Sequence, residues 1–146
     1  MNKLSLSIII PVFNSEKILP SLVENIIFYL NKDFLDQEYE IILINDFSSD
    51  NSWQIITELS KKLKNLKGLN LSKNFGQHNA VMAGLNVASG DKIITMDDDF
   101  QHHPSNLIYF FHKLDECDAC YTYYNNRKHN FWKRIISRLN NLFSSF

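Results

Sequence analysis

The stretch Gly90–Gln101, GDKIITMDDDFQ, places a short apolar strand directly before three consecutive carboxylates and a carboxamide. Ile93, Ile94 and Met96 form an apolar run of the kind that a sheet buries, and the Gly90-Asp91 pair supplies a turn before it. His103-Pro104 follows the acidic residues and ends the segment. The stretch therefore predicts a strand that ends in a polar site.

The three aspartates Asp97, Asp98 and Asp99 repel one another unless a cation or a set of donors compensates them. The carboxylate oxygens of Asp97 and Asp99, at positions i and i+2, with the amide oxygen of Gln101 two residues further on, suit Mg²⁺ or Mn²⁺. Such an ion keeps open positions for a phosphorylated substrate. A solvated acidic turn is the alternative interpretation of the aspartates taken alone.

Composition indicates one globular domain, since 45% of the 146 residues are hydrophobic and 21% are charged. No uninterrupted apolar stretch reaches the roughly 18 residues of a membrane span, and Met1–Ser7 is too short and polar for a secretory signal. We therefore expect a cytoplasmic protein. Cys117 and Cys120 lack the second pair that a zinc site needs, and we expect buried thiols, with a redox pair as the alternative.

The net charge of −1 hides an asymmetry, because all 16 acidic residues lie at or before Asp118. The later residues carry only cations, and no basic surface suited to nucleic acid extends over the body of the chain. From Phe131 to Phe146 apolar residues repeat at helical spacing beside basic ones. This tail predicts an interfacial helix on anionic lipid or, equally, a helix that packs on further protein.

Apolar runs alternate with amphipathic segments along the chain, which predicts an α/β fold with an open, mostly parallel sheet. Ligands of such sheets bind at the carboxyl ends of the strands. The expected strands are 6–12, 39–44, 68–71, 93–96 and 118–124, and the expected helices are 15–30, 53–63, 78–88 and 105–114.

Polar residues follow each of the first four expected strands, which predicts a ligand site at one edge of the sheet. Neither G-x-x-x-x-G-K-[ST] nor G-x-G-x-x-G occurs, which argues against a P-loop enzyme or a dinucleotide oxidoreductase. The polar clusters are Asn14, Asn45-Asp46, Lys73-Asn74 and Asp97–Gln101.

Five motifs together resemble family 2 glycosyltransferases of the GT-A fold, over nearly the whole chain. Within that family the sequence is most similar to polyprenyl-phosphate sugar transferases, the dolichol-phosphate mannose synthase group and its bacterial relatives. The resemblance implies a nucleotide-sugar-binding domain over residues 1–126 and the start of an acceptor or membrane region over 127–146. The motifs are IIIPVFN (8–14), INDFSSD (44–50), SKNFGQ (72–77), MAGL (82–85) and DDDFQ (97–101).

The resemblance also implies roles for individual residues. Asp99 and Gln101 would hold a Mg²⁺ or Mn²⁺ ion that bridges the diphosphate, and Asp97 and Asp98 would contact sugar or ribose. Arg127 matches a cationic position that contacts phosphate and, with Asp97 and Asp99, makes up the expected catalytic set. Pro11, Phe13 and Asp46 match positions around the nucleobase and ribose. The full expected substrate-binding set is Pro11, Phe13, Asn14, Glu16, Asp46, Lys73, Asn74, Asp97 and Asp98.

The expected function is metal-dependent transfer of a sugar from a nucleotide-diphosphate sugar to a polyprenyl phosphate, at the inner face of the cell membrane. The family's chains continue well beyond the length of this one, so we expect a fragment, a truncated reading frame or a half-enzyme whose site another chain completes. The alternatives are an inactive nucleotide-sugar-binding module and a nucleotidyltransferase. The basic Gly-rich loop of the latter is missing near the first strand.

Overall fold

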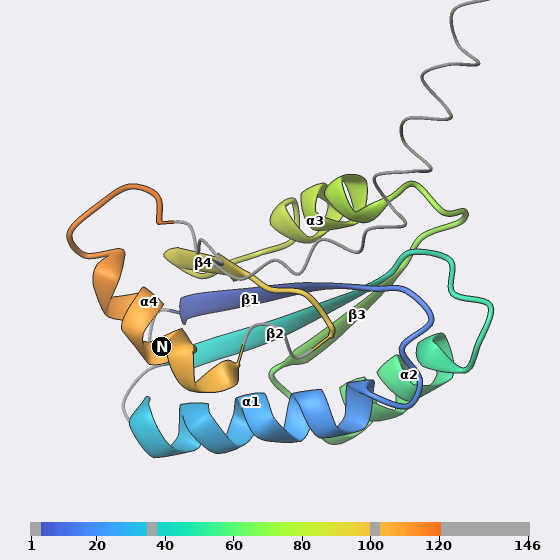
Figure 1. Ribbon diagram of the computed structural model, residues 1–146, viewed down its shortest axis with the longest axis horizontal. Coiled ribbons are helices and arrows are strands. Elements are labelled where there is room, and N and C mark those ends of the chain that lie inside the picture. The colour runs from blue at the N-terminus through green and yellow to red at the C-terminus, as the bar shows by residue number, and fades with distance from the viewer. Residues whose placement is uncertain (1–3, 35–37, 100–102, 121–146) are drawn as a thin grey trace, which may run out of the picture.

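Four parallel strands form the centre of the protein (Figure 1). The computed structural model describes residues 4–34, 38–99 and 103–120. The strands lie side by side in the order β3-β2-β1-β4, so the first strand is internal and the fourth is an edge. This arrangement confirms the α/β class with a parallel sheet. The strands are β1 (Leu4–Val12), β2 (Glu38–Asn45), β3 (Leu66–Asn70) and β4 (Lys92–Thr95).

Helices cover both faces of this sheet, as Figure 1 shows: α1, α2 and α4 lie on one face and α3 on the other. Burial on both faces explains why the two central strands are almost continuously apolar. None of the helices in the described residues is long and apolar enough to cross a bilayer. The helices are α1 (Leu19–Asp33), α2 (Ser52–Lys62), α3 (Gln77–Leu85), a 3₁₀ turn η1 (Pro104–Asn106) and α4 (Leu107–Lys113).

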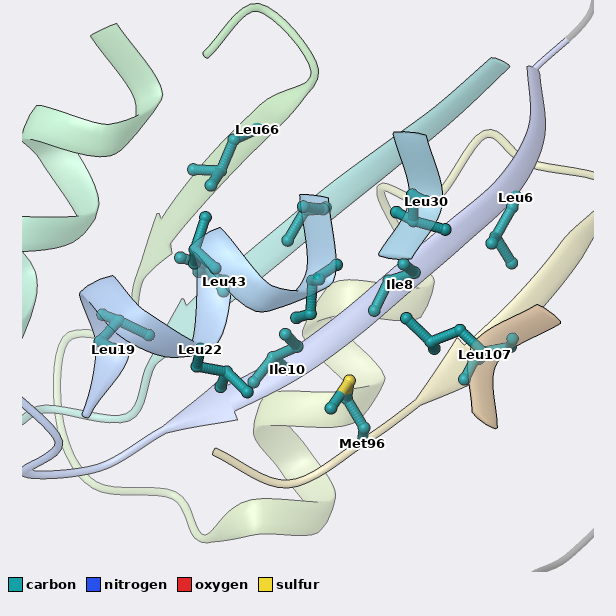
Figure 2. Close-up of a cluster of buried hydrophobic side chains, with 14 of the residues drawn as sticks. Leu6, Ile8, Ile10, Leu19, Leu22, Leu30, Leu43, Leu66, Met96 and Leu107 are labelled. Atoms are coloured by element: carbon teal, nitrogen blue, oxygen red, sulfur yellow. The ribbon is translucent and has the colours of Figure 1, made fainter. Parts of the chain in front are cut away.

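The larger part of the core lies between the sheet and the three helices on its first face (Figure 2). Ile8 and Ile10 of β1 are fully buried there, against Leu22 of α1 and beside Met96 and Leu107. Burying one such side chain contributes about 1.5–3 kcal/mol. Met96 directly precedes the acidic residues, so the core fixes the point at which they leave the sheet.

The smaller core cluster lies under α3 on the second face and contains Ile9 and Ile44. Gly84 of α3 packs so closely there that an added Cβ would lie 2.6 Å from Cγ2 of Ile9 and 2.9 Å from Cδ1 of Ile44. A glycine at this position therefore allows the helix to approach the sheet. The MAGL motif contributes to packing through this residue, while Met82 is exposed.

Several predicted boundaries differ from the observed ones. The first helix begins at Leu19 and not at residue 15, because Ser15 to Ile18 form a turn and Pro20 occupies the first helical turn. The helix expected at 105–114 is divided into the 3₁₀ turn and α4. In the predicted fifth strand, 118–120 are not in a strand and 121–124 lie outside the described residues. The expectation that Cys117 and Cys120 are buried is wrong, since both are exposed.

Candidate functional site

A cavity of about 380 Å³ opens at the carboxyl ends of the strands, where the polar clusters of the sequence meet. This is the edge at which open parallel sheets bind their ligands. Its wall combines the end of β1, the start of α3 and the acidic residues after β4. The lining residues are Pro11, Val12, Phe13, Asp46, Asn74, Gly76, Gln77, Asp97, Asp98 and Asp99.

The acidic residues after β4 are held apart by donors from different elements. Oδ1 of Asp97 accepts a hydrogen bond from Nε2 of Gln77, at the start of α3, at 2.6 Å. Oδ2 of Asp98 accepts from Oγ of Ser15 and from the N–H of Phe13, at 3.2 Å, in the loop after β1. These contacts fix the direction of two carboxylates and connect the end of β4 to both neighbouring walls of the cavity.

Asp46 anchors the loop that forms another wall of the cavity. Its carboxylate is buried, and Oδ1 accepts from the N–H of Phe75 at 2.8 Å while Oδ2 accepts from the N–H of Gly76 at 2.9 Å. The sequence predicts that Asp46 binds the nucleobase, and the structure places it at the cavity. Both carboxylate oxygens already hold a backbone loop, so loop anchoring is a role that the sequence did not reveal. An ionised carboxylate has further lone pairs, and a ligand donor can still reach it.

Pro11, Phe13 and Asn74, which the sequence assigns to substrate binding, line the cavity together with the three aspartates. Phe13 is 51% exposed, so its side chain is accessible for stacking on a flat ligand. Gln101 and Arg127 lie outside the described residues. Their expected contacts with metal and phosphate stay predictions.

Three residues of the predicted substrate-binding set do not line this cavity: Asn14, Glu16 and Lys73. Oε2 of Glu16 accepts from both the backbone N–H and Nδ2 of Asn51, each at 2.9 Å, so this side chain is directed to the start of α2. Nζ of Lys73 lies 4.9 Å from the centre of the Phe75 ring. Their expected contacts with the substrate stay predictions.

Asn14 joins the loops after β1 and β2. Its backbone has a φ of 55°, and its Oδ1 accepts from the N–H of Ser49 at 2.8 Å. In the same loop pair Asp50 accepts from the N–H of Ser52 and the N–H of Glu16, each at 3.0 Å. Burial acts to raise the pKa of Asp50, but these hydrogen bonds outweigh it and the pKa lies below its ordinary value.

Sequence reasoning missed Val12, Gly76 and Gln77 as lining residues. Val12 is apolar and gave no chemical signal. Gly76 and Gln77 belong to the SKNFGQ motif, which the sequence showed only as a loop before a helix. A Gln at the first position of a helix that begins at a strand-end site was the available signal for Gln77.

The donor set fits a divalent ion that a substrate helps to hold. Within residues 4–34, 38–99 and 103–120, no three His, Cys, Asp or Glu side chains are arranged to hold a metal by themselves. Mg²⁺ in substrate sites usually takes only one or two carboxylates, together with phosphate oxygens and waters. Asp97 to Asp99 at the cavity wall meet that smaller requirement.

The fold is that of GT-A glycosyltransferases. TarS (residues 1–349) of S. aureus, solved in complex with UDP-GlcNAc, matches with a TM-score of 0.59 and 28% identity, over 77% of this chain and 32% of that one. PcManGT, a mannosyltransferase from Pyrobaculum calidifontis solved with GDP-Man and Mn²⁺, matches with a TM-score of 0.55. It covers 68% of this chain and 28% of its own, and at 16% identity it supports the fold alone.

The family model "Glycosyl transferase family 2" matches residues 7–145, so this chain belongs to that family. The undecaprenyl-phosphate 4-deoxy-4-formamido-L-arabinose transferase of Yersinia pestis (strain Pestoides F) is 38% identical over 138 residues, 93% of this chain. The corresponding transferase of Proteus mirabilis (strain HI4320) is also 38% identical, over 92% of this chain. The chain spans about two fifths of the length of these relatives, 42% and 41%. The resemblance to family 2 is confirmed.

Proposed function

We propose that this chain binds a nucleotide-diphosphate sugar in the strand-end cavity and serves the transfer of the sugar to a polyprenyl phosphate. The observation that carries the proposal is the cavity itself, a space of about 380 Å³ that is lined by three aspartates and by the exposed residue Phe13. A nucleotide sugar needs both an aromatic surface for its base and an oxygen-rich, metal-binding wall for its diphosphate. The relatives named as undecaprenyl-phosphate transferases support the acceptor class.

The nucleoside half of the donor is assigned to the wall formed by Pro11 and Phe13. The exposed ring of Phe13 stacks on the base, and Asp46 holds the opposite loop in place through the N–H groups of Phe75 and Gly76. TarS, a similar structure, was solved in complex with UDP-GlcNAc, which supports a nucleotide sugar as ligand.

The diphosphate is assigned to the acidic wall. Asp99, with Gln101, would hold Mg²⁺ or Mn²⁺, while Asp97 and Asp98 face ribose or sugar and Arg127 a phosphate. When bound, such an ion neutralises charge on the diphosphate and makes the nucleoside diphosphate a better leaving group. Gln77 and Ser15 orient Asp97 and Asp98, so two of the carboxylates are positioned before the ligand enters.

The acceptor chemistry requires little help from the protein. A phosphate oxygen is already anionic at neutral pH, so a polyprenyl phosphate can attack the sugar carbon without a general base. We place this reaction at the inner face of the cell membrane, with the basic segment 127–146 in contact with anionic lipid. An oligomer or a partner chain that completes the acceptor side is part of the same proposal.

Turnover by the purified chain tests the proposed function. UDP- and GDP-sugars are incubated with the chain, Mn²⁺ and undecaprenyl phosphate in detergent, and release of nucleoside diphosphate is followed. We expect lipid-dependent release that is lost in Asp99→Asn. Binding of nucleotide without any release, in the presence of lipid, would contradict the transferase and leave a nucleotide-sugar-binding module.

A further inference from the structure

Glu40 is a buried carboxylate on the second face of the sheet, away from the cavity. It lies in the first half of β2, and its side chain is only 4% exposed. Its register partner on β1 is Ser7, and from Ser7 to Phe13 at the cavity β1 and its loop run six residues, about 20 Å. The mechanism proposed above makes no use of it.

A hydrogen-bond network centred on Glu40 connects three strands with the turn before β4. Oε1 accepts from Oγ of Ser7 and from the N–H of Ser89, each at 2.7 Å. Oγ of Ser7 accepts in turn from the N–H of Gly90 at 2.9 Å. Oε2 is paired with Nζ of Lys67 on β3 at 2.6 Å. The carboxylate thus holds the N–H of Ser89 directly and that of Gly90 through the hydroxyl of Ser7.

The turn is pressed against β1 at this point. A Cβ added to Gly90 would lie 2.5 Å from the backbone N of Ser7 and 2.6 Å from the carbonyl carbon of Leu6. No other residue fits here without moving the turn. Close packing therefore fixes the position of Ser89 and Gly90 against β1. The hydrogen bonds that their N–H groups donate to Glu40 and Ser7 define this position.

The network adds a second constraint on the register of β4. The strand has only four residues and, within the described residues, pairs with β1 alone at the edge of the sheet. Ile94 and Met96 are buried while Ile93 and Thr95 are exposed, which favours the observed register, because a slip by one residue would place Thr95 at the buried position of Met96. This apolar constraint rests on two side chains, and the Glu40 network acts on the strand from its other end. Such a slip would also move Asp97 to the position of Asp98.

We infer that Glu40 and Ser7 are positioning residues for the candidate active site. They fix the register of β4 on β1 at the N-terminal end of β4. They thereby place Asp97, Asp98 and Asp99, which follow the C-terminal end of β4, at the cavity. The inference rests on the proposed function for its consequence, the binding of a metal-nucleotide complex. Its structural part, the register of β4, is measured independently.

Two variants test the inference in the full chain. Glu40→Gln keeps the size of the side chain and removes its charge, and Ser7→Ala removes the bridging hydroxyl; the second serves if the first fails to fold. Lys67→Met is the matched control, because it removes the ion pair and leaves the bonds to Ser7 and Ser89. Hydrogen exchange is measured on the backbone amides, and affinity for UDP with Mn²⁺ is measured by calorimetry on fully folded protein.

We expect the amides of β4 to exchange about tenfold faster or more in both variants, while those of β1 and β2 change little. Affinity for UDP with Mn²⁺ should fall about tenfold in both variants. In a chain that already carries Asp99→Asn, Glu40→Gln should lower this affinity by less than a further factor of about two, because both changes act through the same carboxylates. Lys67→Met should affect both quantities less.

A purely structural role would give a different result. Global destabilisation would speed exchange in β1, β2 and β4 alike and leave the affinity of folded protein unchanged, which would overturn the inference. Unchanged exchange in β4 in both variants would also overturn it. If the wild-type chain binds neither UDP with Mn²⁺ nor Mn²⁺ alone, the proposed function fails, and faster exchange confined to β4 would still support the register assignment.

Discussion

Asp46 binds Gly76 through its carboxylate: Oδ2 accepts the N–H of Gly76 at 2.9 Å, 30 residues further along the chain. The same carboxylate accepts the N–H of Phe75 at 2.8 Å. The end of β2 is thereby attached to the loop that leads into α3. Both segments line the cavity, so Asp46 determines the width of the site whether or not it touches a ligand.

Substitution of Asp46 tests this anchoring role. Asp46→Ala removes two charge-assisted hydrogen bonds that the partly buried N–H groups of Phe75 and Gly76 donate, each worth about 1.5–3 kcal/mol, and should lower the free energy of unfolding as well as nucleotide affinity. Asp46→Asn keeps one acceptor oxygen and should show about half the loss. Urea unfolding monitored by circular dichroism gives the first quantity. Unaltered stability with weakened binding would mean that Asp46 acts only on the ligand.

Two glycines in the second half of the chain should respond to alanine for different reasons. Gly84→Ala should destabilise by about 1–3 kcal/mol, because its Cβ would overlap Ile9 and Ile44. Gly76 has no atom within 4 Å of a built Cβ, but its φ of 85° and ψ of 156° suit glycine alone, at a cost of about 1–3 kcal/mol for another residue.

A second substitution, which makes room for the added Cβ at Gly84, distinguishes the two explanations. Ile44→Val should partly rescue Gly84→Ala, since it removes the Cδ1 methyl group that lies 2.9 Å from the added Cβ, and should leave Gly76→Ala unaffected. The measurement is the midpoint of thermal unfolding for the single and double variants. If the second substitution changed the midpoint of thermal unfolding equally in Gly84→Ala and Gly76→Ala, the packing explanation would be contradicted.

Acid should destabilise the protein partly through Glu40. Burial acts to raise the pKa of Glu40, but its bonds with Lys67, Ser7 and the N–H of Ser89 outweigh burial, and the pKa lies below its ordinary value. A lowered folded-state pKa stabilises the fold above the unfolded value, about 4.3, and this contribution is lost as the pH falls through the folded-state value. The free energy of unfolding of Glu40→Gln should therefore decrease less steeply than that of the wild type as the pH falls below about 4.

The acid effect should be reduced in that variant but not abolished, because the pKa of Asp50 is lowered as well. Urea unfolding at neutral pH and at several acidic values gives the slope of the free energy of unfolding against pH. An identical slope for wild type and Glu40→Gln would show that Glu40 has the same pKa in both states.

The basic segment after Asn130 should bring the chain to anionic membranes. Each Lys or Arg near the surface contributes about 1 kcal/mol, and the apolar residues between Phe131 and Phe146 add burial. Truncation after Asn130 should abolish sedimentation with vesicles that contain phosphatidylserine, and added salt should weaken it in the intact chain. Absence of binding by the intact chain at low salt would assign this apolar face to protein packing instead.

Sequence alone predicted the strands β1 to β4, the layers and the edge of the sheet that carries the cavity, because continuous apolar runs and strand-end polar residues have local signatures. Phe13 and the aspartates, which the sequence assigns to the site, line the cavity. Glu16 and Lys73 do not line it, since the direction of a loop side chain depends on partners such as Asn51 and Phe75 that the sequence does not identify. The Glu40 network was missed for the same reason.

The binding of UDP with Mn²⁺ tests the central claim most directly. Isothermal titration calorimetry compares the wild-type chain with Asp99→Asn and with Asp91→Asn, a matched substitution near the start of β4. We predict binding that requires Mn²⁺, is lost when the ion is chelated, weakens about tenfold or more (1.4 kcal/mol or more) in Asp99→Asn and persists in Asp91→Asn. Equal affinity with and without chelator, or in both variants, would contradict a metal-nucleotide site at the end of β4.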